Sequence, residues 1–331
     1  MVNKIRIGLL SKQRGNYKLQ QKFAGEENVK DTTREEVAHH EQALLEAGYA
    51  VEVIEWSPDF ISQVTKANVD LIFNVSCMVE AAILEELEIP FVGSGTTAIA
   101  LSTDKSLAKR LWLEADIPTS EFVVIHDLAE CRQFIAAPSI PYPLFTKPVA
   151  GRGSSGINNQ SLIQNEDQLM RIVEELLRTI GQPVLVERFL EGREITIGLV
   201  GNGDQIRTLL PLEIVYGKGT RFLTFDKKEM ENEKFICPAK LTEREFEDLI
   251  RYATSAFKLL GLRDYARIDT KLTLKGFMLL ESNTFAGLMC TPIEKPFSYI
   301  GFMARAEKKG GKELIGEIVS AALERINYKK G

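Results

Sequence analysis

Apolar and polar positions alternate in a regular way over the first hundred residues. Patterns of buried strands at 4–10, 49–56 and 69–75 are separated by helical patterns at 33–48 and 79–88. Thr33, followed three residues later by Glu36, predicts a capping box at the start of the first helix. Strands that alternate with helices predict a parallel sheet covered on both faces.

The pattern changes near residues 104 and 191. The second segment predicts a smaller α+β unit, with helices at 104–116, 127–136 and 165–180 and strands at 117–125, 143–149, 157–163 and 183–190. The third predicts an antiparallel pair at 192–215 and a long polar loop at 217–240. A helix at 242–260, a hairpin at 267–283 and two final helices follow. Such long loops are often lids or binding loops. We therefore expect an α/β and α+β fold with three domains, at 1–103, 104–190 and 191–331.

Composition narrows the class of protein. Hydrophobic residues make up 44% and charged residues 26%, and 41 basic against 46 acidic side chains give a formal charge of −5. This balance is typical of a globular protein and lacks the basic surface of nucleic-acid binding, so we expect no nucleic-acid partner. No apolar run approaches the ~20 residues of a membrane span, so we expect no membrane partner either.

Cysteine and histidine usage points to a reducing compartment and away from zinc. The four cysteines are far apart, and the N-terminus lacks a signal-peptide pattern, which together predict reduced thiols in the cytoplasm. Only three histidines occur, so a histidine-rich zinc site and a Ser-His-Asp triad are poorly supported. Chemistry is then expected from carboxylates, lysines, arginines and backbone amides.

The segment RIDTKLTLKGFMLLESN, residues 267–283, predicts a hairpin with polar chemistry on one face. A three-residue turn at 274–276 would pair Asp269 with Glu281 and Arg267 with Asn283, all on the same face. The other face would carry a mostly apolar set: Ile268, Thr270, Leu272, Met278, Leu280 and Ser282.

Two facing carboxylates repel each other unless a cation neutralises them. Carboxylate and amide oxygens suit Mg²⁺ or Mn²⁺. A surface ladder of ion pairs, in which Arg267 balances Asp269, is the alternative, and the hairpin alone does not decide between the two.

KPVAGRGSSG, residues 147–156, predicts a phosphate-binding loop that follows a strand, with Lys147 supplying charge. Its glycines match GxGxxG, but the strand pattern that follows excludes a dinucleotide site, which needs a helix there. The H-R-D and D-F-G elements of a protein kinase are absent. A flexible surface hairpin is the alternative.

PVLVERFLEGRE, residues 183–194, is an apolar strand that runs into a polar bend. Main chain beside Phe189 and Leu190 could hold an adenine, and a carboxylate could accept hydrogen bonds from a ribose. An ordinary linker between domains is the alternative.

Together these stretches resemble the ATP-grasp superfamily, and most closely the D-alanine–D-alanine ligase family. The likeness covers most of the chain and is densest in four blocks: IPFVGSGTTAIALSTDKSLAKRLWLEADIPT (89–119), KPVAGRGSSG, VLVERFLEGREIT and ARID…LLESNTFAG. It implies a three-domain ATP-grasp fold, with ATP held between the central and C-terminal domains, and a ligase that joins a carboxylate to an amine through an acylphosphate. A homodimer and small amino-acid-like substrates are also implied.

The resemblance assigns roles to particular residues. The ATP phosphates would be held by Lys105, Lys147, Gly153, Ser154, Ser155 and Lys228. Glu187, Arg188, Phe189 and Leu190 would line adenine, and Glu194 would bind ribose. The magnesium ligands would be Asp269, Glu281 and Asn283. The catalytic groups would be Arg267 and the Gly287 amide, which stabilise an oxyanion, with Lys228 and Ser154; Ser154 and Glu229 are candidates for the general base.

The chain departs from the family where the amino-acid substrates bind. The HGxxGEDG turn is replaced by SCMVEAAILEE (76–86), NTxPG by NTFAG, and the tyrosine beside the loop lysine by Glu229. We therefore predict intact activation chemistry with a substrate pair other than two D-alanines. A true D-alanine–D-alanine ligase is one alternative, and an ATP-binding regulatory protein without turnover is another.

Overall fold

The N-terminal part of the protein is a parallel sheet covered on both faces, as predicted. The structure is a computed structural model that describes residues 4–11, 33–75, 78–151, 156–217, 233–291 and 298–327. The strands β2 (Ala50–Glu55), β1 (Arg6–Ser11), β3 (Leu71–Phe73) and β4 (Phe91–Val92) lie in that order, all parallel. Helix α1 (Arg34–Glu46) begins with the predicted capping box of Thr33 and Glu36.

The two faces of this sheet pack against different helices. Leu9 and Phe73 pack with α1 and with the C-terminal helix α10 (Gly311–Arg325). Leu10 and Ile72 pack with α2 (Phe60–Lys66) and α3 (Met78–Glu86). Because α10 belongs to the end of the chain, the first and third segments share one core; the division at 103, 190 and 331 stays a prediction.

The central unit is a four-stranded antiparallel sheet backed by two helices. Its strands β5 (Phe122–Ile125), β8 (Val184–Arg188), β6 (Leu144–Pro148) and β7 (Leu162–Ile163) lie in that order. Helices α6 (Leu128–Ala136) and α7 (Glu166–Ile180) cover one face. The strand predicted over 157–163 is reduced to β7, because a 3₁₀ turn at Asn159–Ser161, capped by Asn158, occupies its first half.

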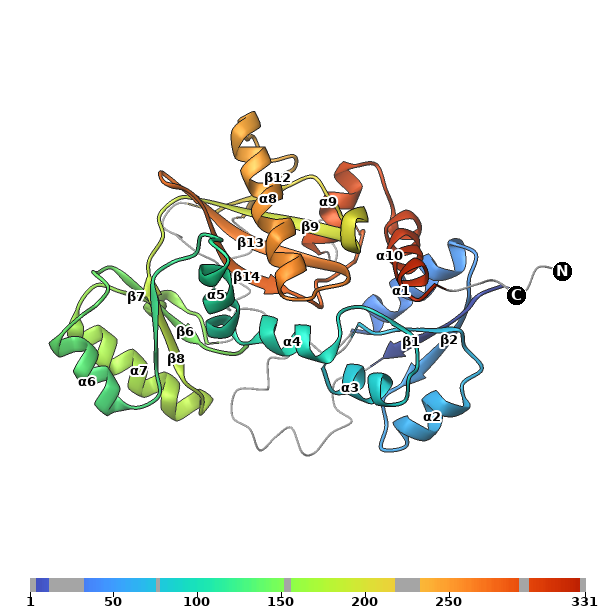
Figure 1. The fold of residues 1–331 in the computed structure, drawn as a ribbon, viewed down its shortest axis with the longest axis horizontal. Coiled ribbons are helices and arrows are strands. Elements are labelled where there is room, and N and C mark those ends of the chain that lie inside the picture. The colour runs from blue at the N-terminus through green and yellow to red at the C-terminus, as the bar shows by residue number, and fades with distance from the viewer. Residues whose placement is uncertain are drawn as a thin grey trace.

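The third unit is a six-stranded sheet that lies between the other two in Figure 1. Its path is β12 (Lys234–Ile236), β11 (Leu212–Val215), β9 (Arg193–Gly201), β13 (Asp264–Thr273) and β14 (Gly276–Asn283), and β10 (Arg207–Thr208) pairs with β9. Helix α8 (Glu243–Leu259) packs on one face, and α9 (Tyr299–Ala306) with α10 packs on the other. Strand β12 corrects the loop predicted over 217–240, of which 218–232 lies outside the described residues.

Two helices connect the first sheet to the other two. One helix was predicted at 104–116, but the structure has α4 (Thr96–Thr103) followed at once by α5 (Lys105–Glu114). Asp104 separates them because its carboxylate accepts the backbone N–H of Ser106 at 2.9 Å and of Leu107 at 3.0 Å, which caps α5. This cap places Lys105 in the first turn of α5, facing the third sheet.

Candidate active site

A cavity opens between the central sheet and the six-stranded sheet. Strands β6 and β8 line one side of it, and β9, β11, β13 and β14 line the other, with Tyr299 of α9. Every described residue predicted for the site except Gly287 lies in its lining: Lys105, Lys147, Glu187, Arg188, Phe189, Leu190, Glu194, Arg267, Asp269, Glu281 and Asn283. The four sequence blocks therefore meet at one place.

Strands β13 and β14 form the predicted ribbon with the predicted polar pairs. Asp269 lies opposite Glu281, and Arg267 lies opposite Asn283. The predicted turn is wrong, however, because Thr273 pairs with Gly276 and leaves a loop of two residues instead of three. Gly276 has a φ of +103°, a conformation that glycine adopts without strain.

A β-bulge at Leu280 compensates for the shorter turn. Thr270 faces Leu279 while Asp269 faces Glu281, so Leu280 is the extra residue in β14. The apolar face consequently carries Phe277 and Leu279, and the placement predicted for Met278 and Leu280 is wrong. Leu280 lines the cavity instead.

Asp269 is the centre of the polar contacts on the ribbon. Arg267 donates from Nε and Nη2 to its two carboxylate oxygens, each at 2.8 Å, and Asn283 Nδ2 donates to Oδ2 at 2.8 Å. Thr196 Oγ1 of β9 donates to Oδ1. Burial raises the pKa of Asp269, but the charge of Arg267 and the hydrogen bonds to the carboxylate together lower it further, so the pKa lies below its ordinary value and the carboxylate is charged.

The donor set of Asp269, Glu281 and Asn283 fits a hard divalent cation. The Asn283 amide bridges the carboxylates, with Nδ2 2.8 Å from Asp269 Oδ2 and 3.5 Å from Glu281 Oε1. Within the described ranges, no group of three or more His, Cys, Asp or Glu side chains could hold a metal ion. A cation would thus depend on two carboxylates, one amide and further oxygens from water or a phosphate, which is the usual environment of Mg²⁺.

The opposite wall carries buried lysines. Lys105 and Lys147 are 7% and 5% exposed, and both line the cavity. Lys105 Nζ donates to the carbonyl of Gly151 at 3.0 Å and lies 4.0 Å from Glu281 Oε2, which brings the two walls into contact. Burial lowers the pKa of Lys105. Two ammonium groups in one concave, poorly solvated wall favour an anionic ligand.

Glu187 of β8 lies beneath the lysine wall. Its Oε1 is 2.6 Å from Lys147 Nζ, its Oε2 is 2.9 Å from Lys109 Nζ, and Ser120 Oγ donates to Oε2 at 2.6 Å. Burial raises the pKa of Glu187, but Lys109 and Lys147 lower it further, to about 2. Because the carboxylate is already engaged, the part of Glu187 that a nucleotide base can reach is its main chain.

The far end of the cavity is formed by the bend between β8 and β9. Phe189 and Leu190 line it, and the guanidinium of Arg188 turns away to lie 3.4 Å from Glu121. Glu194 Oε2 lies 3.0 Å from Lys271 Nζ. A carboxylate held in place at the cavity edge is suited to accept hydroxyl groups.

The sequence reasoning missed two polar side chains of the lining, Lys271 and Tyr299, and it missed Lys109, which lies behind Glu187. Lys271 follows Arg267 and Asp269 at spacing two, so the alternation already used for the ribbon would have placed it on the polar face. Lys109 lies four residues after Lys105, on the same side of α5. For Tyr299, which stacks on Arg267 with the guanidinium carbon 5.0 Å from the ring centre, no local signal exists.

One predicted residue lies outside the lining of this cavity, and the others that remain lie outside the described residues. Gly287 follows β14 and packs against Ser298, outside the lining. Gly153, Ser154, Ser155 and Lys228, together with Glu229, lie outside the residues that the structure describes. Their roles stay predictions.

Comparisons with known proteins agree on one family. A family model described as "D-ala D-ala ligase C-terminus" matches residues 111–308. A D-alanine–D-alanine ligase of Cupriavidus pinatubonensis is 30% identical over 241 residues, covering 72% of this chain and 70% of that protein. One of Desulfotalea psychrophila is 31% identical over 253 residues, covering 75% and 74%.

Solved structures show the same fold. The D-alanine–D-alanine ligase from Bacillus anthracis complexed with ATP has a TM-score of 0.74 at 18% identity, covering 99% of this chain and 100% of that one. The VanG D-Ala:D-Ser ligase from Enterococcus faecalis has a TM-score of 0.72 at 18% identity, covering 97% and 100%.

The fold and the site define an ATP-grasp enzyme, an ATP-dependent ligase that forms C–N bonds. More narrowly, the chain belongs to the D-alanine–D-alanine ligase family. Both the fold class and the family expected from the sequence are confirmed.

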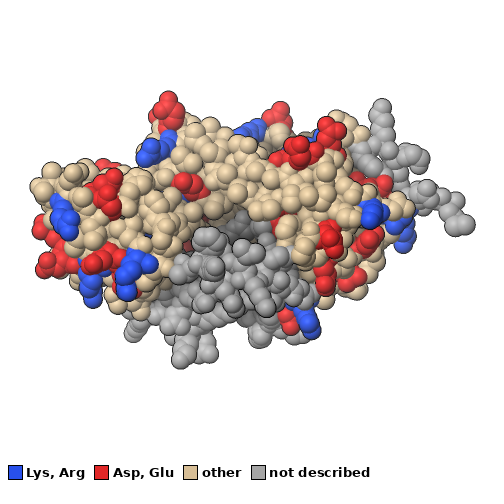
Figure 2. Space-filling model, turned by 90° about the horizontal axis from the view of Figure 1, so that it is seen from below, with Lys and Arg blue, Asp and Glu red and all other residues tan. Residues whose placement is uncertain are grey.

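Two surface observations complete the description. In the described ranges, no helix is long and apolar enough to cross a membrane. On the face seen in Figure 2, basic and acidic side chains are interspersed over the described residues, without a field of one sign.

Proposed function

We propose that this ligase activates an amino-acid-like carboxylate with ATP and transfers the acyl group to an amine. The observation that carries the proposal is the meeting of two walls with opposite charge. One wall has Lys105 of α5 and Lys147 of β6, and the other is a carboxylate ribbon with Arg267 on β13 and β14. A nucleotide triphosphate with a divalent cation offers the complementary charges to both.

Each wall supplies a different part of the nucleotide site. Lys105 and Lys147 would contact the phosphates, and the main chain of residues 187–190 would hold adenine. Glu194 would accept the ribose hydroxyls. A Mg²⁺ or Mn²⁺ ion held by Asp269, Glu281 and Asn283 would offset the charge of the β- and γ-phosphates.

The reaction proceeds in two steps. A carboxylate oxygen attacks the γ-phosphorus, the bond to the β–γ bridging oxygen breaks, and ADP leaves. The amine then attacks the acyl carbon and releases phosphate and a proton, leaving an amide. Arg267 lies at the cavity end nearest Tyr299, where its guanidinium can stabilise the oxyanion of the tetrahedral intermediate, with the Gly287 amide as a second donor.

For the substrates, we propose a pair other than two D-alanines. The support is the replacement of the HGxxGEDG turn, in whose place the chain has helix α3, with the sequence MVEAAILEE. The D-Ala:D-Ser ligase among the structural neighbours supports a change of acceptor within this fold. D-Alanine for both positions is the second candidate, favoured by the names of the sequence relatives.

The test is ADP release from Mg²⁺-ATP with a panel of D- and L-amino acids, offered singly and in pairs, with products identified by mass spectrometry. We expect release only with particular pairs, with an amide as product. D-alanyl-D-alanine formed from D-alanine alone at full rate would replace the proposed substrates by the second candidate. ATP binding without release for any pair would instead favour a regulatory protein without turnover.

Location and assembly belong to the same proposal. A cytoplasmic location is supported by the need for ATP and by the free thiols of Cys131, Cys237 and Cys290. The expected homodimer rests on the family resemblance, and sedimentation would test it.

A further inference from the structure

Lys109 is a buried cation that does not line the cavity. Its side chain is 0% exposed, in the middle of α5, and its ammonium group lies behind Glu187. A lysine is seldom buried so completely unless it is paired. The proposed reaction gives this residue no contact with a substrate, so its place in the fold needs another reason.

All three ammonium protons of Lys109 have partners. Nζ donates to Thr119 Oγ1 at 2.7 Å and to Ser120 Oγ at 2.9 Å, and it lies 2.9 Å from Glu187 Oε2. A lysine has three donors and no acceptor, so this arrangement uses the group completely. Burial lowers the pKa of Lys109 to about 8, against the opposing effect of Glu187.

Two of these partners, Glu187 and Thr119, also contact residues on or beside the walls of the cavity. Glu187 Oε1 lies 2.6 Å from Lys147, the lysine that faces the phosphates. Thr119 Oγ1 donates to the carbonyl of Leu279 at 2.7 Å, and the Leu279 N–H donates to Pro118 at 2.8 Å. Leu279 immediately precedes the bulge that turns Glu281 toward the cavity.

We infer that Lys109 is a positioning residue that fixes Lys147 on one wall and Glu281 on the other. Its ammonium group contacts Glu187 of β8 directly and reaches β14 through Thr119, so one group sets the distance between the lysine proposed to bind phosphate and the carboxylate proposed to bind the metal. This inference rests on the proposed nucleotide site. Without Lys109, Glu187 would lose one of its two cations and keep Lys147 and the Ser120 hydroxyl. Thr119 would lose the donor that orients its hydroxyl toward Leu279.

The test compares Lys109→Met with Arg110→Met, which removes an exposed cation from the same helix. The readout is the Kd of AMPPNP, a non-hydrolysable ATP analogue, measured by calorimetry at several Mg²⁺ concentrations, with folding checked by circular dichroism. We expect Lys109→Met to weaken AMPPNP binding about tenfold, as for the loss of one charge-assisted hydrogen bond, and to raise the Mg²⁺ concentration at half-saturation. Arg110→Met should change neither.

A second variant protects the test against misfolding. Thr119→Val keeps the ammonium group and its contacts with Glu187 and Ser120, but removes the hydroxyl that accepts from Lys109 and donates to Leu279. We expect a shift of about threefold in the Mg²⁺ requirement, as for the loss of the neutral hydrogen bond to Leu279. If Lys109→Met folds and binds AMPPNP with an unaltered Kd and Mg²⁺ requirement, Lys109 stabilises the fold but does not position the ligands. If that variant does not fold, a Thr119→Val protein with an unaltered Mg²⁺ requirement leads to the same conclusion. Failure of the unsubstituted protein to bind AMPPNP would instead overturn the proposed function.

Discussion

The two walls of the cavity carry opposite excess charge. On one side, Lys109 and Lys147 share the buried carboxylate of Glu187, and Lys105 adds a third ammonium group that donates to the Gly151 carbonyl. On the ribbon, one guanidinium, Arg267, faces the carboxylates of Asp269 and Glu281. One wall therefore has more positive than negative charges, and the other has more negative than positive charges.

This difference separates a site from a merely structural charge cluster. A buried charge without a partner costs several kcal/mol of folding free energy. In a protein without a ligand, keeping the excess positive charge of one wall apart from the excess negative charge of the other would therefore bring no gain in stability. Lys105 and Glu281 remain 4.0 Å apart, too long for a hydrogen bond, although joining them would satisfy both. The proposed phosphates for one wall and the proposed cation for the other would explain why both persist.

The largest expected effect comes from the ribbon. Asp269→Asn and Glu281→Gln each remove one proposed ligand charge while keeping the side-chain shape. We expect kcat to fall by at least ~10³, because a metal supplies several kcal/mol of transition-state stabilisation. ADP release with the productive substrate pair measures it.

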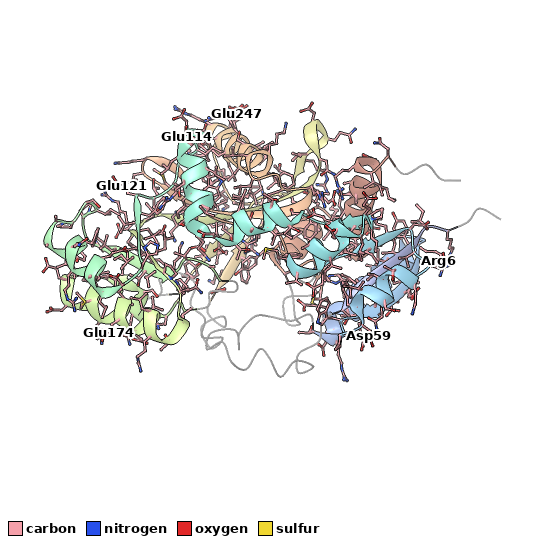
Figure 3. All side chains as sticks on the ribbon, turned by 60° about the horizontal axis from the view of Figure 1, so that its bottom comes forward. Arg6, Asp59, Glu114, Glu121, Glu174 and Glu247 are labelled. Carbon is pink, nitrogen blue, oxygen red and sulfur yellow. The ribbon has the colours of Figure 1, made fainter. Side chains whose placement is uncertain are left out.

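The matched control for these variants is Glu247→Gln on α8, an exposed side chain at the periphery in Figure 3. Its turnover should be unchanged. Near-normal turnover in either ribbon variant would contradict the metal site and favour the alternative, in which Asp269 and Glu281 belong to a surface ladder of ion pairs.

A change of Arg267→Lys should have the next largest effect. The charge is kept, but lysine cannot reproduce the fork that donates to both Asp269 oxygens at 2.8 Å. We expect kcat to fall about 10²-fold, as for the loss of one oxyanion donor, with a smaller change in the KM for ATP. Arg251→Lys on α8 is the control. A fall in ATP affinity without a fall in kcat would assign Arg267 to the nucleotide instead of the intermediate.

The ribbon also shows how far sequence reasoning reaches. The pairs Asp269–Glu281 and Arg267–Asn283 were predicted from alternation, and they are present. The predicted turn was nevertheless one residue too long. The extra residue at the Leu280 bulge shifts the register back by one, so the predicted pairing is restored from Asp269 and Glu281 onward. Nothing in LKGFMLL marks a bulge, because its energy depends on how β14 meets Pro118 and Thr119, which are distant in sequence.

The lysine wall was predictable in part for a different reason. Lys105 and Lys147 were identified through the family blocks, whereas Lys109 has the same local pattern as a solvated lysine on a helix. Its burial depends on the packing of α5 against α8 and β14 and on the ion pair with Glu187 of β8, which no local pattern encodes. Similarly, α10 covers the N-terminal sheet although more than two hundred residues separate them.

Nucleotide binding by the lysine wall should depend on pH between about 8 and 9, whereas the contribution of the ribbon should not. The pKa of Lys109 lies at about 8, below its ordinary value, because burial disfavours the charged form. Bound phosphates favour that charged form, so nucleotide affinity should be highest below pH 8 and fall as the pH rises through it. For one linked proton, the Kd of AMPPNP should rise about fivefold between pH 8 and pH 9.

Calorimetry across this range measures the effect, and Lys109→Met supplies the comparison. The part of the pH dependence that belongs to Lys109 should vanish in that variant. An identical alkaline slope in both proteins would assign the titration to Lys105, whose pKa burial also lowers.

The smallest expected effect concerns Lys271, at the far end of the cavity, on the same strand as Arg267 and Asp269. Its ammonium group lies 3.0 Å from Glu194, so it orients the carboxylate proposed to accept the ribose hydroxyls. Lys271→Met should lower the preference for ATP over dATP about threefold, because one hydrogen-bonded contact contributes about 0.5–1.5 kcal/mol. Lys275→Met, at the exposed tip of the same ribbon, should leave the ratio of kcat/KM values for the two nucleotides unchanged. If the ratio stays the same in both variants, Lys271 balances the charge of Glu194 without orienting it, and the ribbon contributes to the metal and acyl chemistry but not to recognition of the sugar.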